Sequence, residues 1–188
     1  SAEREHNWHD GLKPNFLLTV TPLSHEPGLR EDGVAVCTHP DLRWKRCDIK
    51  SLNLLPNVLA KHAAAEKGCF EAVLVSEEDG TVTEGTSTAF FAVFENRLFV
   101  TPLATHILPS ITRRFICRAA VNIGMTVVEQ ALVPDEVFDA DEVFVASTTR
   151  DIVPVTMFDE RIISGGRPGP YAAALYREFR RFTDAATR

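Results

Sequence analysis

Short apolar runs bounded by turn-forming residues recur along the chain and predict β-strands. Asp79-Gly80 and Glu95-Asn96 separate neighbouring runs between residues 72 and 101, and such dipeptides favour tight hairpins. This part of the chain is therefore expected to be antiparallel. The predicted strands are residues 16–21, 33–38, 72–76, 81–83, 89–94, 98–101, 126–131, 142–147 and 153–158.

Three segments have the signals of helices instead. Residues 57–67 are rich in alanine, follow Pro56 and end at Gly68, which is the usual asymmetry of helix ends. Residues 110–122 carry apolar side chains at helical spacing, and residues 170–186 close the chain as a third helix. Strands interspersed with helices predict a mixed α/β (α+β) layer fold.

The composition is that of one ordinary globular domain, with 188 residues of which 45% are hydrophobic and 24% are charged. The net charge of −6 and the scattered basic residues argue against binding to nucleic acid. No apolar run reaches the roughly 20 residues that span a bilayer, so no membrane association is expected. The four cysteines form no C-x-x-C pair, which favours a reducing, cytoplasmic setting.

Lys50 lies among the apolar residues Ile49, Leu52, Leu54 and Leu55. A lone lysine is usually a surface charge. These neighbours nevertheless predict a strand that is buried on at least one face and carries the amine into a partly dry site. Desolvation disfavours the charged ammonium, so a free amine there can attack a carbonyl carbon. Lys50 is therefore a candidate Schiff-base residue.

Glu84 lies in the segment 80–88, which is otherwise made of glycine, valine and small hydroxyl residues. One interpretation is an exposed glutamate on an edge strand. The functional interpretation is a carboxylate that faces a pyridine ring nitrogen. An acidic partner keeps such a nitrogen protonated, so that the ring can withdraw electrons from a carbanion.

Two further segments suggest a phosphate site. Ser110 and Thr112 lie where the helix 110–122 begins, and the free N–H groups of a first helical turn bind phosphate. Ser147, Thr148 and Thr149 end a predicted strand in three hydroxyl groups, which would reach the phosphate from the opposite side. The alternatives are a plain helix cap and a polar loop.

These four segments, in this order and at these separations, resemble the class-IV (fold-type IV) pyridoxal-phosphate aminotransferases. That group also contains branched-chain aminotransferases and aminodeoxychorismate lyase. The run Ile-Lys-Ser-Leu-Asn-Leu-Leu-Pro-Asn-Val-Leu-Ala-Lys61 around Lys50 is most similar to the D-amino-acid aminotransferase branch. The resemblance implies the large C-terminal domain of this fold, a mixed sheet or pseudo-barrel flanked by helices.

The resemblance also implies roles for individual residues. Lys50 would form the Schiff base with pyridoxal 5′-phosphate and move the proton between substrate and cofactor. Glu84 would pair with the pyridine nitrogen, and Leu108 would pack under the ring. The residues expected at the phosphate are Ser110, Ile111, Thr112, Ser147 and Thr148.

Arg4-Glu-His6 lies about as far before Lys50 as the family's Arg-x-His pair that binds the substrate α-carboxylate. An arginine fork offers bidentate donors to a carboxylate, and Thr149 is expected near the same substrate. The alternative is a chance Arg-x-His in a terminal segment. A metal site at His6 and His9 lacks further ligands, so no metal is expected.

The chain departs from the family pattern in two respects. Ser110 stands where the family usually has glycine. The family's smaller N-terminal domain, with its phosphate-binding arginine and its substrate-pocket tyrosine, has no counterpart in these residues. We therefore expect residues 1–24 to lead from such a domain and residues 25–188 to form the cofactor-binding domain of a longer enzyme.

The function expected from the resemblance is transamination of D-amino acids such as D-alanine, with 2-oxoglutarate or pyruvate as acceptor, by a homodimer. A branched-chain aminotransferase or an aminodeoxychorismate lyase would keep Lys50 and Glu84 without needing Arg4 and His6. A non-catalytic protein that binds pyridoxal phosphate or another phosphate is the alternative from a different class.

Overall fold

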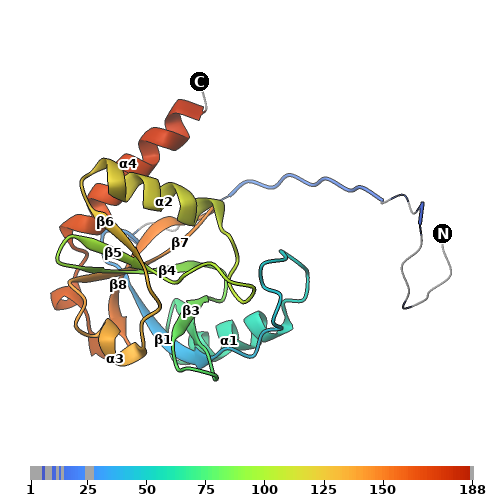
Figure 1. Ribbon diagram of the computed structural model, residues 1–188, viewed down its shortest axis with the longest axis horizontal. Helices are drawn as coiled ribbons and strands as arrows, with labels where there is room; N and C mark the ends of the chain where they lie inside the picture. The colour runs from blue at the N-terminus through green and yellow to red at the C-terminus, as the bar shows by residue number, and fades with distance from the viewer. Residues whose placement is uncertain (1–5, 7–9, 12, 14, 24–27, 187–188) are drawn as a thin grey trace.

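The computed structural model describes residues 6, 10, 11, 13, 15–23 and 28–186. Within these residues nine strands form one mixed sheet, in the spatial order β3-β2-β1-β8-β7-β4-β5-β6 with β9 paired to β8 (Figure 1). The strands are β1 (Val34–Pro40), β2 (Glu71–Val75), β3 (Val82–Gly85), β4 (Ala89–Phe94), β5 (Arg97–Val100), β6 (Thr126–Glu129), β7 (Glu142–Ser147), β8 (Asp151–Phe158) and β9 (Arg161–Ile162). The helices are α1 (Leu55–Glu66), α2 (Ile111–Asn122), α3 (Pro134–Val137) and α4 (Pro170–Ala186), with a short 3-10 turn at Ser164–Gly166.

Pairing within the sheet is mixed. The pairs β1–β2, β1–β8 and β5–β6 are parallel, and the other pairs are antiparallel. The predicted hairpins are present between β2 and β3 and between β4 and β5. Glu95 and Asn96 turn the second hairpin with φ of 46° and 64°, because two positive φ values match the twist of the flanking strands. The predicted mixed α/β fold is confirmed.

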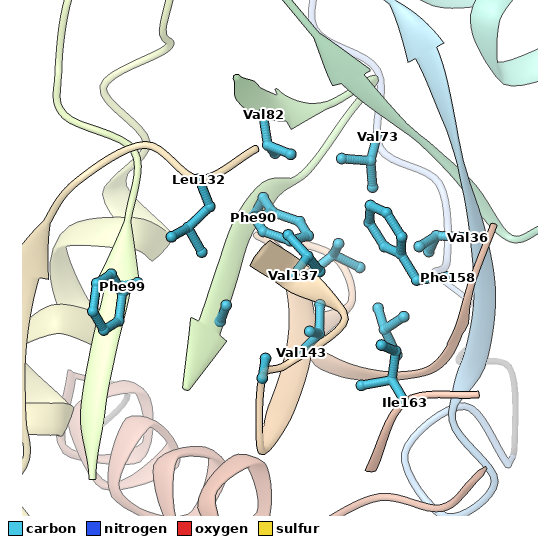
Figure 2. Close-up of a cluster of buried hydrophobic side chains, with 14 of the residues drawn as sticks. Val36, Val73, Val82, Phe90, Phe99, Leu132, Val137, Val143, Phe158 and Ile163 are labelled. Carbon is cyan, nitrogen blue, oxygen red and sulfur yellow. The ribbon is translucent and has the colours of Figure 1, made fainter. Parts of the chain in front are cut away.

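Each face of the sheet has its own core, since successive strand residues point to opposite faces. Phe90 and Phe158 meet edge to face in the hydrophobic cluster on one face of the sheet, where Val137 of α3 also packs (Figure 2). Phe91 and Phe144 stack on the other face with their ring centroids 4.8 Å apart. Helices α2 and α4 cover that second cluster. Burying both faces fixes the register of the central strands.

The three predicted helices are confirmed, with small differences at their ends. Helix α1 begins at Leu55 rather than residue 57, because Pro56 takes its first turn. Helix α4 spans the predicted residues, and the N–H groups of Tyr171 and Ala172 donate to the two carboxylate oxygens of Glu142 at 2.7 and 2.8 Å. The described residues contain no helix that is both long and apolar enough to cross a membrane.

The predicted strand at residues 16–21 is wrong. This segment is extended, but it pairs with no strand of the described chain, and Phe16 and Leu17 are each 87% exposed. Figure 1 shows the blue segment leading away from the domain. A β-strand is completed by hydrogen bonds to a neighbour, and an apolar sequence alone does not supply one.

The expected buried strand around Lys50 is also wrong. Residues 47–54 form a loop with local hydrogen bonds, from Ser51 N to Ile49 O and from Leu54 N to Leu52 O. Leu52 is 96% exposed. These local hydrogen bonds take the place of pairing with a second strand. Helix α3, strand β9 and the 3-10 turn were missed because a single helical turn and a two-residue strand are too short to show a helical or an alternating period.

Candidate active site

One pocket of about 1140 Å³ lies where the loop after β1, helix α1, the end of β3, the start of α2 and the end of β7 meet. It is lined by seven of the residues that the sequence singles out, which come from four separate segments of the chain. They are Lys50, Glu84, Leu108, Ser110, Ile111, Ser147 and Thr148. The roles of these residues remain predictions, but their proximity is a property of the fold.

Lys50 lies on the wall of this pocket in an exposed loop. The loop is tied to the rest of the domain by the hydrogen bond from Asp48 N to Thr105 O, 3.1 Å long. The neighbouring Cys47 side chain is buried and donates to the carbonyl oxygen of Trp44 at 3.1 Å. These contacts place the lysine at the pocket while leaving its amine accessible to a bound molecule.

Glu84 is 6% exposed although β3 is an end strand of the sheet, so the interpretation as an exposed edge glutamate is wrong. Its Oε1 accepts hydrogen bonds from Nη1 of Arg43 and, at 3.2 Å, from the backbone N–H of Leu108. Burial raises the pKa of Glu84 above its ordinary value, and this effect outweighs the opposing charge and hydrogen bonds of Arg43.

Arg43 is a pocket residue that the sequence analysis missed. Its guanidinium group joins Asp41 and Glu84, and the side chains of all three are less than 10% exposed. Burial opposes ionisation of Asp41, but the hydrogen bonds and charge of Arg43 outweigh it and hold the pKa of Asp41 below its ordinary value. The only local signal was an Asp-x-Arg spacing, which is too common to indicate a site.

The beginning of α2 provides hydrogen-bond donors at one end of the pocket. Ser110 caps the helix: its hydroxyl accepts from Arg113 N at 3.3 Å, and its carbonyl accepts from Arg114 N at 3.2 Å. The N–H groups of Ile111 and Thr112 have no acceptor within the described part of the chain. Two free N–H groups at the positive end of a helix dipole suit an anion such as phosphate.

The end of β7 reaches the same place. The hydroxyl oxygens of Thr112 and Thr148 are 3.4 Å apart, although the residues are 36 positions apart in the chain. Thr112 does not line the pocket itself, but its hydroxyl adjoins one that does. Arg113 turns away, donating to Thr101 O at 3.1 Å and to Glu129 at 3.0 Å. The donors that this end of the pocket offers to an anion are therefore N–H and hydroxyl groups.

Glu71 supports a further wall of the pocket and was also missed. It is fully buried, and its carboxylate accepts hydrogen bonds from the hydroxyl groups of Thr86, Ser87 and Thr88. A side chain at Gly85 would collide with Thr88 Oγ1, so this tight approach requires glycine. The buried glutamate thereby holds the pocket-lining segment 86–88 against β2. The predicted strand begins at residue 72, so the sequence analysis gave Glu71 no role.

The remaining predicted substrate residues are not brought into the pocket. Thr149 is exposed on the turn after β7 and does not line it. His6 is exposed and does not line it either. Arg4 lies outside the described residues. The two predicted substrate residues that the structure describes, His6 and Thr149, therefore do not meet at the pocket.

Comparison with known proteins places this chain in a family. A model of the family "Amino-transferase class IV" matches residues 2–158. A D-alanine aminotransferase of Bacillus licheniformis is 41% identical over 169 residues, which cover 90% of this chain and 59% of that protein. A D-alanine aminotransferase of Staphylococcus aureus (strain N315) is 38% identical over 185 residues, which cover 98% and 65%. The chain spans less than two thirds of the length of these relatives.

Solved structures share the fold. A branched-chain amino acid aminotransferase from Thermobaculum terrenum in its PLP form gives a TM-score of 0.74 at 28% identity, covering 82% of this chain and 52% of that chain. A branched-chain aminotransferase from Thermoproteus uzoniensis with norvaline gives 0.72 at 27% identity, covering 81% and 52%. The predicted fold-type IV architecture is therefore confirmed.

The raised pKa of Glu84 predicts a pH dependence of stability. Above pH 4.5, the ordinary value, the unfolded chain releases this proton while the folded protein still holds it. The stabilisation from Glu84 is thus fully present below pH 4.5 and is lost as the pH rises through the folded pKa. Urea unfolding of the cofactor-free protein between pH 4.5 and neutral should show this decline in the wild type and a smaller one in Glu84→Gln, which keeps Glu142, another glutamate whose pKa is raised by burial.

Glu66→Gln, which removes a carboxylate that is 70% exposed, serves as the control and should follow the wild-type profile. Asp41 contributes in the opposite sense and in a different range. Its lowered pKa contributes stability that is fully present above pH 3.8, its ordinary value, and is lost as the pH falls below that value. Parallel pH profiles for the wild type and Glu84→Gln would contradict the assignment.

Proposed function

Since the chain belongs to the amino-transferase class IV family, we propose that it transfers the amino group of D-amino acids such as D-alanine to a 2-oxo acid, 2-oxoglutarate or pyruvate. The cofactor in this proposal is pyridoxal 5′-phosphate. The observation that carries the proposal is the single pocket that joins an accessible lysine, a buried glutamate and a helix N-terminus with adjacent hydroxyl groups. These are the groups that the aldehyde, ring nitrogen and phosphate of the cofactor require.

The residues of the pocket fit the cofactor from end to end. The free N–H groups of Ile111 and Thr112, together with the hydroxyls of Thr112, Thr148 and Ser147, bind its phosphate. Glu84 binds its ring nitrogen, and Leu108 packs against its ring. When bound, the cofactor supplies an electron sink for the substrate carbanion.

Lys50 has two tasks in this proposal. Its Nζ would hold the cofactor covalently through the aldehyde carbon, as the amine of a Schiff-base lysine does. Once released by the incoming amino acid, the free amine of Lys50 would be the group that holds the proton lost from the substrate Cα. Its position on the pocket wall, accessible to a bound molecule, supports both tasks.

The preference for D-amino acids rests on the relatives. The two curated relatives that are 41% and 38% identical are named D-alanine aminotransferases. We further propose that residues 25–188 form the cofactor-binding domain and that Arg4, His6 and Thr149 bind the substrate. The solved structures named branched-chain aminotransferases favour a second candidate, transamination of branched-chain amino acids.

Lys50 should be the covalent attachment site. Adding pyridoxal 5′-phosphate to the purified protein should produce visible absorbance that D-alanine bleaches and L-alanine does not. Reduction with borohydride followed by peptide mass mapping should place the adduct on Lys50. In Lys50→Ala the adduct should be absent and the rate of transamination should fall by about 10²-fold or more, the usual worth of a positioned acid–base group.

Lys61→Arg is the matched control. Lys61 also lines the pocket, but its Nζ donates to the carbonyl oxygen of Phe70, so it should carry no adduct and its replacement should leave the Lys50 adduct in place. An adduct on Lys61 instead of Lys50 would contradict the assignment. Bleaching by branched-chain L-amino acids in preference to D-alanine would favour the second candidate.

Thr148 and Thr149 form a natural pair for testing the phosphate site, because only Thr148 lines the pocket. Thr148→Ala removes a hydroxyl beside Thr112 and should weaken the binding of pyridoxal 5′-phosphate about tenfold or more, the effect of one hydrogen bond to a charged group. Thr149→Ala should leave that affinity unchanged. Equal losses of affinity, measured by equilibrium titration, would argue against the phosphate assignment.

We also propose a homodimer, as is usual for the family, formed through the exposed apolar side chains of α1 beside the pocket. Leu55 and Leu59 are 67% and 57% exposed and do not line the pocket. Sedimentation equilibrium should find a dimer that Leu59→Asp weakens about 30-fold or more, as a central interface residue does. Val121→Asp, at a comparably exposed position on α2, is the control. A monomer at every concentration would contradict the proposal.

A further inference from the structure

We propose that Arg43 is a positioning residue: it fixes one oxygen of Glu84 and favours the ionised carboxylate, so that the other oxygen faces the pocket. The inference rests on the proposed function, in which Glu84 binds the ring nitrogen of the cofactor. It concerns a side chain that lies seven residues before Lys50 and shares the pocket with it.

Asp41 sets the orientation of the Arg43 guanidinium. Nε donates to Asp41 Oδ1 at 2.8 Å and Nη2 donates to Asp41 Oδ2 at 2.7 Å, which is a bidentate pair. Asp41 is held in turn by Thr83 Oγ1, which donates to Oδ2 at 2.8 Å. Nη2 of Arg43 also donates to the carbonyl oxygen of His106 at 3.2 Å. With this edge of the rigid plane engaged, Nη1 is directed at Glu84 Oε1.

The two oxygens of Glu84 are in different situations. Oε1 accepts from both Arg43 Nη1 and Leu108 N. Oε2 has no hydrogen-bond donor within the described part of the chain. It is also accessible to solvent, because Arg113 Nε is the only unpaired side-chain N or O atom in those residues that is fully buried. A buried ion pair that served folding alone would be expected to satisfy both oxygens. The free oxygen belongs to a residue that lines the pocket.

The charge of Arg43 also favours the ionised form of Glu84. The pKa of Glu84 is raised by burial even with the arginine present, so loss of this charge would leave the carboxyl still harder to ionise. The other ionisable groups that act on Glu84 and its neighbours are Asp41 and the thiol of Cys47, and Lys50 lines the same pocket. A neutral carboxylic acid would not favour a protonated ring nitrogen.

Arg46 is a matched control within the same loop. It makes the same bidentate pair with the aspartate two residues away, from Nε to Asp48 Oδ1 at 2.9 Å and from Nη2 to Asp48 Oδ2 at 3.0 Å. Its side chain is 54% exposed and forms no contact with Glu84. Replacing Arg46 therefore removes an arginine–aspartate pair without touching the carboxylate in the pocket.

The first test needs no cofactor. Carbon-13 NMR titration of the side-chain carboxyl groups should report the pKa of Glu84, whose signal is identified by its loss in Glu84→Gln. In Arg43→Met this pKa should rise by about 1–3 pH units, the effect of removing an adjacent opposite charge. Arg46→Met should leave it unchanged. Arg43→Lys keeps a positive charge but loses the planar guanidinium group, so it should raise the pKa of Glu84 by less. It replaces Arg43→Met in the comparison if that variant fails to fold.

The second test asks whether Arg43 acts through Glu84. Arg43→Lys should lower the affinity for pyridoxal 5′-phosphate about tenfold when Glu84 is present and by much less in the Glu84→Gln background. The visible absorbance of the bound cofactor should change in the first background only. An unchanged pKa of Glu84 in both Arg43 variants, or equal losses of affinity in both backgrounds, would overturn the inference. A raised pKa in a protein whose wild type binds no cofactor would support Arg43 and overturn the proposed function.

Discussion

The burial of Glu84 is the constraint on which the pocket depends. A carboxylate removed from water is stable only if charges or hydrogen-bond donors replace the lost hydration. Arg43 and the backbone N–H of Leu108 supply that replacement at a single oxygen. Three segments that are distant in sequence, the loop after β1, strand β3 and the approach to α2, are thereby joined at one point. The hydrogen bonds to the Glu84 carboxylate therefore determine where this wall of the pocket lies.

A second buried carboxylate, Glu71, organises the adjoining wall in the same way. Its hydrogen bonds to three consecutive hydroxyl residues hold this wall in place. Elsewhere in the domain, packing of apolar side chains has that role. The hydrophobic clusters lie on the two faces of the sheet, whereas the pocket is supported by polar networks at the β2–β3 end. Such networks are sensitive to the loss of any member, because each remaining partner is left buried and unpaired.

Local sequence signals predicted most of the fold. The two strand predictions that were wrong share one cause, the lack of a partner strand. Helix α4 and the hairpin at Glu95-Asn96 were foreseeable because the information lies within a few residues. The apolar runs at 16–21 and around Lys50 also suit a strand, but suitability does not provide a partner strand. Arg43 and Glu71 escaped notice because their partners, Glu84 and residues 86–88, are adjacent only after β2 and β3 have paired.

The topology of the sheet explains why separate motifs form one site. Strand β7 lies between β8 and β4, and β4 pairs with β5, whose chain continues into α2. The end of β7 and the start of α2 therefore meet, which brings Thr148 to Thr112. Glu84 and the α2 terminus are fixed by buried partners, whereas Lys50 remains in an exposed loop. The described residues thus preorganise the ring-nitrogen and phosphate ends of the proposed site and leave the lysine exposed.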